Sequence, residues 1–254
     1  MIVEYLRRGV AAGAVAGIAY GLYMLLVGNP LSEYVHDGGH DHGHGDGGHD
    51  HGHGEHAHEA GHAVSEATTA VVSAGSGLLW AIFLGGVFAV ALYLFEPALP
   101  GSSGVKSYVL AGAGFLTVSG VPWLVLPPAA PGAEHAYAIG PRLGMYVGLA
   151  VLGAITAAGA VAAYNRGRRR HAGLGFLAGA VPILVVAGVL TLTAPTVTTH
   201  PGLSGDLVTA YQGLAVLSQA ALWLVIAGGF NAVRRRESGS ETESTRPTDD
   251  AVAG

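Results

Sequence analysis

GLLWAIFLGGVFAVALYLF, the stretch of residues 77–95, contains nineteen residues and no charged side chain. An α-helix of this length rises about 28 Å, close to the roughly 30 Å thickness of the hydrocarbon core of a bilayer. Five more apolar stretches of similar length flank it, at residues 9–27, 108–126, 143–164, 173–194 and 207–230. The sequence therefore predicts an all-α, polytopic membrane helix bundle with about six transmembrane helices.

The composition of the chain agrees with a membrane location. Half of the 254 residues are apolar and only 11% are charged, against roughly 25% charged residues in an ordinary soluble domain. The chain has no cysteine, so any metal ligand must be an imidazole, a carboxylate or a backbone oxygen. We therefore expect a multi-pass protein of the cell membrane, surrounded by the lipid bilayer and without a nucleic-acid partner.

The basic residues predict the orientation of the chain, because lysine and arginine in short loops are retained on the cytoplasmic side. With the N-terminus placed in the cytoplasm, eleven of the twelve basic residues fall inside, and only Arg142 falls outside. We predict that both the N- and the C-terminus are cytoplasmic. Residues 1–236 then form a transmembrane domain with an outer loop at 28–76, and residues 237–254 form a disordered cytoplasmic tail.

The predicted outer loop is rich in histidine. Between residues 36 and 62, ten of 27 positions are histidine, interspersed with glycine and with carboxylates. Neutral imidazoles beside carboxylates bind borderline divalent cations, and the many glycines favour capture by a mobile tract over one rigid site. The predicted ligands are His36, His40, His42, His44, His49, His51, His53, His56, His58 and His62.

Three other interpretations of this loop remain open. It can be a solvated acidic loop that binds metal only incidentally. The run HEAGH at residues 58–62 matches the H-E-x-x-H pattern of zinc proteases, although this composition produces such spacings readily. If a helix begins near Glu55, then His58, His62 and Glu66 share one helical face and can form a more ordered metal site.

The other two outer loops carry a second candidate site. Glu134, His135, His200 and Asp206 lie in short segments that proline stiffens. We expect Glu134, His135 and His200 to act as metal ligands if these segments meet above the bundle, and N and O ligands suit Co(II), Ni(II) or Zn(II). The alternative is that these are exposed loop residues without a joint role.

Inside the predicted spans, the centres hold no ionisable side chain, which disfavours coupling through a carboxylate proton relay. The sequence GSSGVKS at residues 101–107 lacks the adjacent Gly-Lys of an ATP-binding loop, so we predict no ATPase. Glycines spaced by four residues predict close helix contacts. They occur at Gly9, Gly13, Gly17 and Gly21, at Gly144 and Gly148, and at Gly175 and Gly179.

Three features together resemble the CbtA family of predicted cobalt transporter subunits. They are a first span followed by an outer histidine-rich loop, the segment LVLPPAAPG at 124–132, and the ending HPGLSGDLVTAYQGLAVLSQAALWLVIAGG at 200–229. The resemblance implies Co(II) uptake linked to cobalamin synthesis and a small single-span CbtB-like partner subunit. We expect no enzymatic activity and no permanently bound cofactor. The resemblance also implies five spans, one fewer than the hydropathy and charge patterns predict.

The identity of the metal does not follow from the residues, because Ni(II) and Cu(II) bind the same ligands more tightly than Co(II). A nickel or zinc transporter subunit is therefore the nearest alternative. An outer-face metal reservoir or sensor that moves no ion is the next, and a membrane metalloprotease is the most distant.

Overall fold

Helices make up nearly all of the structure, which is a computed structural model that describes residues 2–38, 55–195 and 197–244. The side chains of residues 36–38, 55–67, 69, 70 and 238–244 lie outside that description. The helical elements are α1 (Ile2–Tyr23), η1 (Met24–Gly28), α2 (Asn29–Gly38), α3 (Glu55–Phe95), α4 (Ser103–Phe115), η2 (Leu116–Gly120), α5 (Val121–Trp123), α6 (Ile139–Gly167), α7 (Ala172–Thr193) and α8 (Gly205–Ser244).

Six of the described helical stretches are long and apolar enough to cross a membrane, as the sequence predicts. They are Ile2–Val35, Val71–Phe95, Ser103–Trp123, Ile139–Gly167, Ala172–Thr193 and Gly205–Glu237. The α1–η1–α2 segment forms the first span, and the α4–η2–α5 segment forms the third. The chain is therefore a multi-pass membrane protein with six candidate spans.

The helices extend further than the apolar stretches. Within the predicted outer loop, α2 continues to Gly38 and α3 already begins at Glu55. No proline occurs between Pro30 and Pro97, so after Pro30 no residue in the described parts of α2 and α3 lacks the backbone N–H that a helical hydrogen bond needs. At the other end of the chain, α8 reaches Ser244, beyond the predicted start of the tail at residue 237. Residues 245–254 lie outside the described part, and the disorder of the tail remains a prediction.

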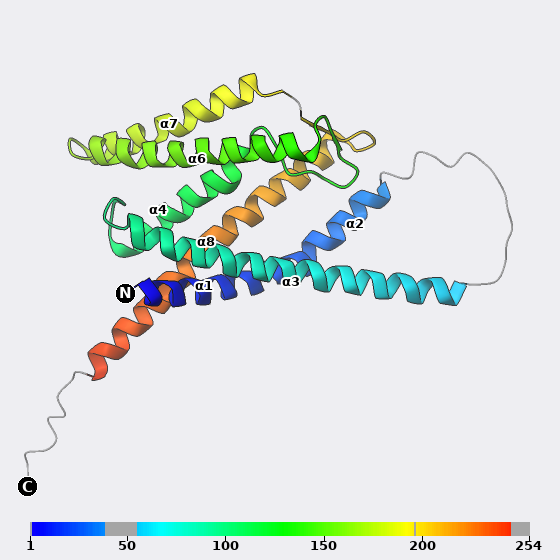
Figure 1. Cartoon of the computed structure of the whole chain (residues 1–254), viewed down its shortest axis with the longest axis horizontal. Coiled ribbons are helices and arrows are strands. Elements are labelled where there is room, and N and C mark those ends of the chain that lie inside the picture. The colour runs from blue at the N-terminus through cyan, green and yellow to red at the C-terminus, as the bar shows by residue number, and fades with distance from the viewer. Residues whose placement is uncertain (1, 39–54, 196, 245–254) are drawn as a thin grey trace, which may run out of the picture.

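The spans pack into a bundle in which α1 and α3 form one antiparallel pair and α6 and α7 form another (Figure 1). α1 packs along α3 and against α8, α4 packs against α8, and α6 packs against α7 and η2. The start of α3 and the two short strands lie at one end of the bundle, whereas the N-terminus and the α6–α7 turn lie at the other. This alternation agrees with the predicted pattern of inner and outer loops, while the orientation itself remains a prediction.

The glycine ridge of the first span lies against α3. A Cβ atom on Gly9 would lie 2.3 Å from the carbonyl oxygen of Gly85, and one on Gly13 would lie 2.5 Å from that of Ala81. On Gly17, it would lie 2.7 Å from the side chain of Leu78. Without a hydrophobic force between helices in lipid, such close backbone contact is a main source of their attraction. The predicted contact of this ridge is confirmed.

The other two glycine pairs differ from each other. A Cβ atom on Gly175 would lie 3.0 Å from the Arg168 side chain, and one on Gly179 would lie 3.2 Å from the Ala160 carbonyl oxygen. Gly144 and Gly148 would meet no described atom within 4 Å. The prediction of a helix contact is therefore wrong for this pair, because a four-residue spacing does not say which helix face meets a neighbour.

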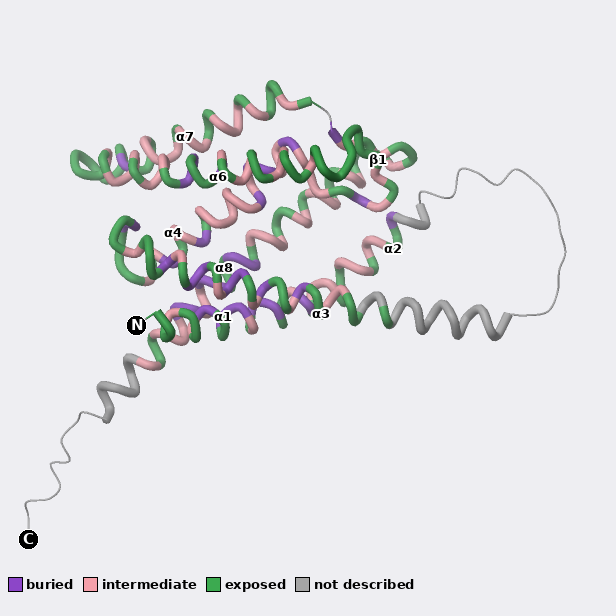
Figure 2. The backbone as a smooth tube through the Cα atoms, viewed as in Figure 1, coloured by how far each residue is buried: buried purple, intermediate pink, exposed green. Residues whose placement is uncertain are grey.

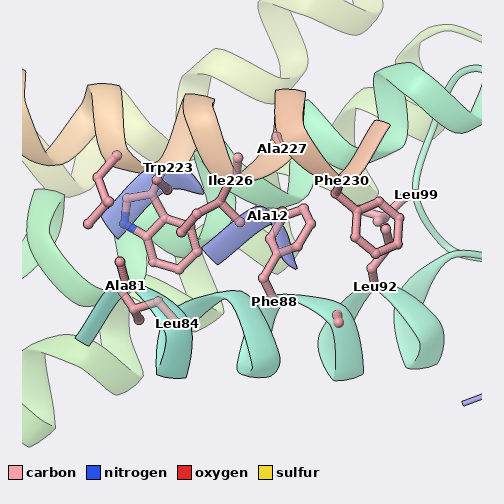
Figure 3. Close-up of a cluster of buried hydrophobic side chains, with 14 residues drawn as sticks. Ala12, Ala81, Leu84, Phe88, Leu92, Leu99, Trp223, Ile226, Ala227 and Phe230 are labelled. Atoms are coloured by element: carbon pink, nitrogen blue, oxygen red, sulfur yellow. The ribbon is translucent and has the colours of Figure 1, made fainter. Parts of the chain in front are cut away.

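Large side chains fill the space where α1, α3 and α8 meet (Figure 3). Phe88 and Phe230 meet edge to face with ring centroids 5.8 Å apart, and both are fully buried. Ala12 of α1 lies between the two longer helices, where a larger residue would not fit. Figure 2 shows that burial is concentrated in these helices, whereas α7 is mostly exposed, as expected of a helix that contacts lipid.

Polar groups tie α8 to its neighbours at the end of the bundle that holds the N-terminus. The Ser107 hydroxyl donates to the Asn231 side-chain oxygen at 3.0 Å, and the Asn231 amide donates to the Gly104 carbonyl at 3.1 Å. Arg8 forms an ion pair with Glu237 near the N-terminus. Because Ser107 and Asn231 are buried, these bonds fix the position of α8 against α4.

A two-stranded antiparallel sheet joins the two described loops at the opposite end. β1 (Glu134–His135) pairs with β2 (Thr198–Thr199), with Glu134 opposite Thr199 and His135 opposite Thr198. The Ala136 N–H also donates to the Val197 carbonyl at 3.0 Å, and Val197 is buried. The α5–α6 and α7–α8 loops are therefore held together by their backbones.

The glycine contacts predict unequal effects of one added methyl group. Gly13→Ala forces the methyl group against the α3 backbone and should lower the free energy of unfolding by about 1–3 kcal/mol. The matched variant Gly144→Ala should have no such cost, since nothing described lies near it. Thermal unfolding of the purified proteins in detergent compares the two, and equal stability would contradict the α1–α3 contact.

The strand register predicts a specific cross-link, which the cysteine-free chain makes easy to test. Glu134→Cys combined with Thr199→Cys places two thiols on directly opposed residues, where the geometry of a disulfide can be met. Mild oxidation should form a disulfide between the α5–α6 and α7–α8 loops. After proteolysis between residues 167 and 172, the two fragments should then remain linked until a reductant is added. Each single-cysteine chain serves as the control, and failure of the double variant to cross-link would refute the pairing.

Candidate functional site

The predicted outer ligands lie where the two paired loops meet. Glu134 and His135 form β1 and are exposed, and the His135 Nδ1 atom lies 3.4 Å from the Thr198 Oγ1 atom. His200 directly follows β2 and is half-buried. The segments therefore come together as expected, through the β1–β2 pairing.

These residues nevertheless do not form a ready metal site. The His200 Nε2 atom accepts a hydrogen bond from the Ala130 N–H at 3.1 Å, so the neutral ring carries its proton on Nδ1, and neither nitrogen has a free lone pair for a metal while this bond is formed. Among residues with described side chains, no group of three histidines or carboxylates lies close enough to hold an ion. His200 has a structural contact that the sequence does not predict, and a joint role in binding remains a prediction.

The ten histidines of the outer loop fall on residues whose side chains are not described. His40, His42, His44, His49, His51 and His53 lie outside the described backbone as well. His36 belongs to α2, and His56, His58, His62 and Glu66 belong to α3. The start of α3 at Glu55 meets the condition for the proposed ordered site at His58, His62 and Glu66, which itself remains a prediction.

Within the spans, several hydroxyl groups bond to their own helix. Thr117 and Thr156 donate to the carbonyls four residues earlier, at 2.8 and 2.7 Å, and Thr191 and Thr193 do the same in α7. Such bonds satisfy the hydroxyl proton locally. These threonines therefore behave as polar residues of a packed helix, while their oxygen lone pairs remain available.

Trp223 is an unusual polar residue of the core. It is only 4% exposed, and its Nε1–H group has no hydrogen-bond partner among the described atoms. Its ring packs so closely on α4 that a Cβ atom on Gly114 would lie 2.4 Å from it. Gly114 thus allows α8 to approach the third span just before η2.

Two spans contain a π-helical turn that the sequence analysis missed. η1 covers Met24–Gly28 and η2 covers Leu116–Gly120, and each ends in a Gly-x-Pro sequence, at residues 28–30 and 120–122. The repeated Gly-x-Pro within an apolar span was the signal that could have revealed them, since proline interrupts a helix and π turns often occur at functional sites.

In each π turn, two consecutive carbonyls lose their regular helical donor. In η2, the Val121 N–H donates to the Leu116 carbonyl instead of the Thr117 carbonyl. Pro122 has no N–H for the Val118 carbonyl. The Tyr146 hydroxyl of α6 donates to that carbonyl at 2.9 Å. In η1, the Asn29 N–H donates to the Met24 carbonyl, and Pro30 has no N–H. The Leu25 and Leu26 carbonyls therefore lose their regular helical donors.

The two π turns have different surroundings. Leu25 and Leu26 of η1 are 42% and 75% exposed. In contrast, η2 is half-buried or buried throughout and packs against α4, α6 and α8. A Cβ atom on Gly153 of α6 would lie 2.8 Å from the Leu116 carbonyl oxygen, so the backbones nearly touch. Of the two described π turns, only η2 has the carbonyls that lost their regular helical donors among packed protein helices.

Comparison with known proteins identifies a family whose model matches this chain. The model of the family described as "Probable cobalt transporter subunit (CbtA)" matches residues 2–235, which is nearly the whole chain. Neither the curated proteins nor the solved structures provide a significant match. The match covers five of the candidate spans in full and all but the last two residues of the sixth, together with both paired loops and the histidine-rich segment. The chain therefore belongs to the CbtA family of probable cobalt transporter subunits.

Proposed function

We propose that this chain is the membrane subunit of a cobalt uptake transporter and that its histidine-rich loop captures Co(II) at the outer face. The observation that carries the proposal is the family match over residues 2–235. The loop adds a chemical reason, because a chain of this family needs ligands for a divalent cation and has ten histidines in one segment.

The distribution of histidine supports capture from outside. Twelve of the thirteen histidines belong to the predicted outer loops, and only His171 belongs to an inner one. His135 and His200 lie in the loops that β1 and β2 join. A cation concentrated by the long loop would find further imidazoles above the bundle, where weak and exchangeable ligation favours transfer over permanent binding.

Co(II) as the substrate follows from the family, and no residue selects it over its neighbours. Imidazole and carboxylate ligands also suit Ni(II) and Zn(II), so a nickel or zinc subunit is the alternative within the same class. A small single-span CbtB-like subunit is the partner that the family implies. Because the chain lacks an ATP-binding loop, the energy must come from an ion gradient, the membrane potential or another subunit.

Two functions without transport compete with this proposal. An outer-face metal reservoir or sensor would need the same loop but no passage through the spans. A metalloprotease would use His58, Glu59 and His62, yet the family that the chain belongs to is one of transporter subunits and not of enzymes. Transport therefore accounts for both the loop and the six apolar spans.

Uptake of radiolabelled Co(II) and Ni(II) by cells that express the chain, with and without a CbtB-like subunit, tests the proposal. Changing all ten loop histidines to Asn should raise the Co(II) concentration for half-maximal uptake about tenfold or more, because capture contributes at least ~1.4 kcal/mol. The maximal rate should change little, since the spans are intact.

The matched control changes the nearby carboxylates Asp41, Asp46, Asp50, Glu55 and Glu59 to amides and keeps every histidine. This control should have a smaller effect than the loss of the imidazoles. If neither metal is taken up under any of these conditions, although the chain inserts and binds metal, the transporter function is wrong and a reservoir or sensor remains.

A further inference from the structure

The η2 turn has an unusual supply of main-chain oxygen inside the membrane. The Thr117 carbonyl lacks its regular donor because the Val121 N–H bonds Leu116, and the Val118 carbonyl lacks one because of Pro122. Hydrocarbon offers no water to replace a missing donor, so broken helices survive only where protein or a water-filled path surrounds them. The packing of η2 against α4, α6 and α8 meets this condition.

The side chains around these carbonyls add oxygen atoms and no charge. The Tyr146 hydroxyl lies 2.9 Å from the Val118 carbonyl oxygen, and Thr117 keeps the lone pairs of its hydroxyl while it donates to Ala113. Ser119, in the same turn, is only 2% exposed. Carbonyl and hydroxyl oxygens are ligands for hard or partly dehydrated cations.

We propose that η2 is a cation-binding step inside the membrane, formed by the carbonyl oxygens of Thr117 and Val118 and by the Tyr146 hydroxyl. This inference rests on the proposed function, because it supplies the passage that a captured ion must take. Unwound carbonyls in discontinuous spans serve as ion ligands in other transport folds. A rotation of the Tyr146 hydroxyl exposes the Val118 oxygen and turns its own lone pairs toward the ion.

Two ions share this chemistry: the divalent cargo and a monovalent coupling ion such as Na⁺. A transported ion must leave its site quickly, and neutral oxygen ligands allow this. A cage of carboxylates would bind a divalent cation too tightly to release it. Uptake in sodium-free and sodium-containing buffers separates the two sources. A change in the Co(II) concentration for half-maximal uptake identifies the cargo, whereas a change in sodium dependence identifies the coupling ion.

Two substitutions with matched controls test the site in the full chain. Pro122→Ala restores an N–H that can bond the Val118 carbonyl, and Tyr146→Phe removes the hydroxyl. The controls are Pro182→Ala, which repairs a proline inside α7, and Tyr164→Phe, whose ring in α6 contacts Phe176 at 5.3 Å. Each test variant should lower Co(II) uptake about tenfold at equal membrane levels, while each control stays within about twofold.

Selectivity distinguishes a ligand from a purely structural residue. Loss of structure would lower Co(II) and Ni(II) uptake in the same proportion, whereas a changed ligand set should alter their ratio in Tyr146→Phe. Wild-type levels of uptake, selectivity and sodium dependence in both test variants would overturn this inference and leave the transporter function standing.

A binding measurement keeps the inference testable if the wild-type chain moves no metal. In the full-length chain with its ten loop histidines changed to Asn, Co(II) or Na⁺ should raise the temperature of thermal unfolding. Adding Tyr146→Phe should abolish that shift, and adding Tyr164→Phe should preserve it. An equal temperature shift in the Tyr146→Phe and Tyr164→Phe chains would refute the η2 site. So would the absence of a shift with either ion in the chain that keeps both tyrosines.

Discussion

In hydrocarbon, every backbone N–H and C=O must find its partner within the protein, and the rest of this structure follows from that constraint. Six helical spans satisfy it almost completely. Their attraction then depends on close backbone contact, which the glycine ridge of α1 provides against α3. Pairs of carbonyls lose their regular donors before Pro30 and Pro122, and Pro182 removes one further N–H donor within α7. The pair in η2 is enclosed by helices, and its Val118 carbonyl accepts a hydrogen bond from the Tyr146 hydroxyl.

The proposed function divides between the predicted outer end of that bundle and its interior. Each of the three predicted outer loops contains histidine, and β1 and β2 join two of these loops. Imidazoles outside the bundle suit capture of a borderline cation, and neutral oxygens within η2 suit its brief passage. If the cargo ion binds η2 as proposed, its ligands change from nitrogen to oxygen along the path, and no step binds the ion strongly enough to trap it.

The sequence was sufficient for features that depend on local pattern. Apolar length predicted the six spans, and residues near Leu124 and His200 carried the family resemblance. The sequence could not show that Gly13 contacts a neighbouring helix while Gly144 does not. The same four-residue spacing occurs on helix faces with and without such a contact. The strand pairing of Glu134 with Thr199 and the Ala130–His200 bond join distant segments. The π turns depend on hydrogen-bond shifts that only three-dimensional geometry reveals, although Gly-x-Pro marks both.

The most direct test is solid-state NMR of the full-length chain in bilayers, with its ten loop histidines changed to Asn. Carbonyl-¹³C threonine and ¹⁵N valine label only two Thr–Val pairs, Thr117–Val118 and Thr196–Val197, and Thr196→Ser leaves the η2 pair alone. Paramagnetic Co(II) should broaden the Thr117 carbonyl signal, and the diamagnetic Zn(II) should shift it without broadening. A signal that Co(II) leaves sharp and unshifted, in a chain that still takes up cobalt, would contradict passage through η2.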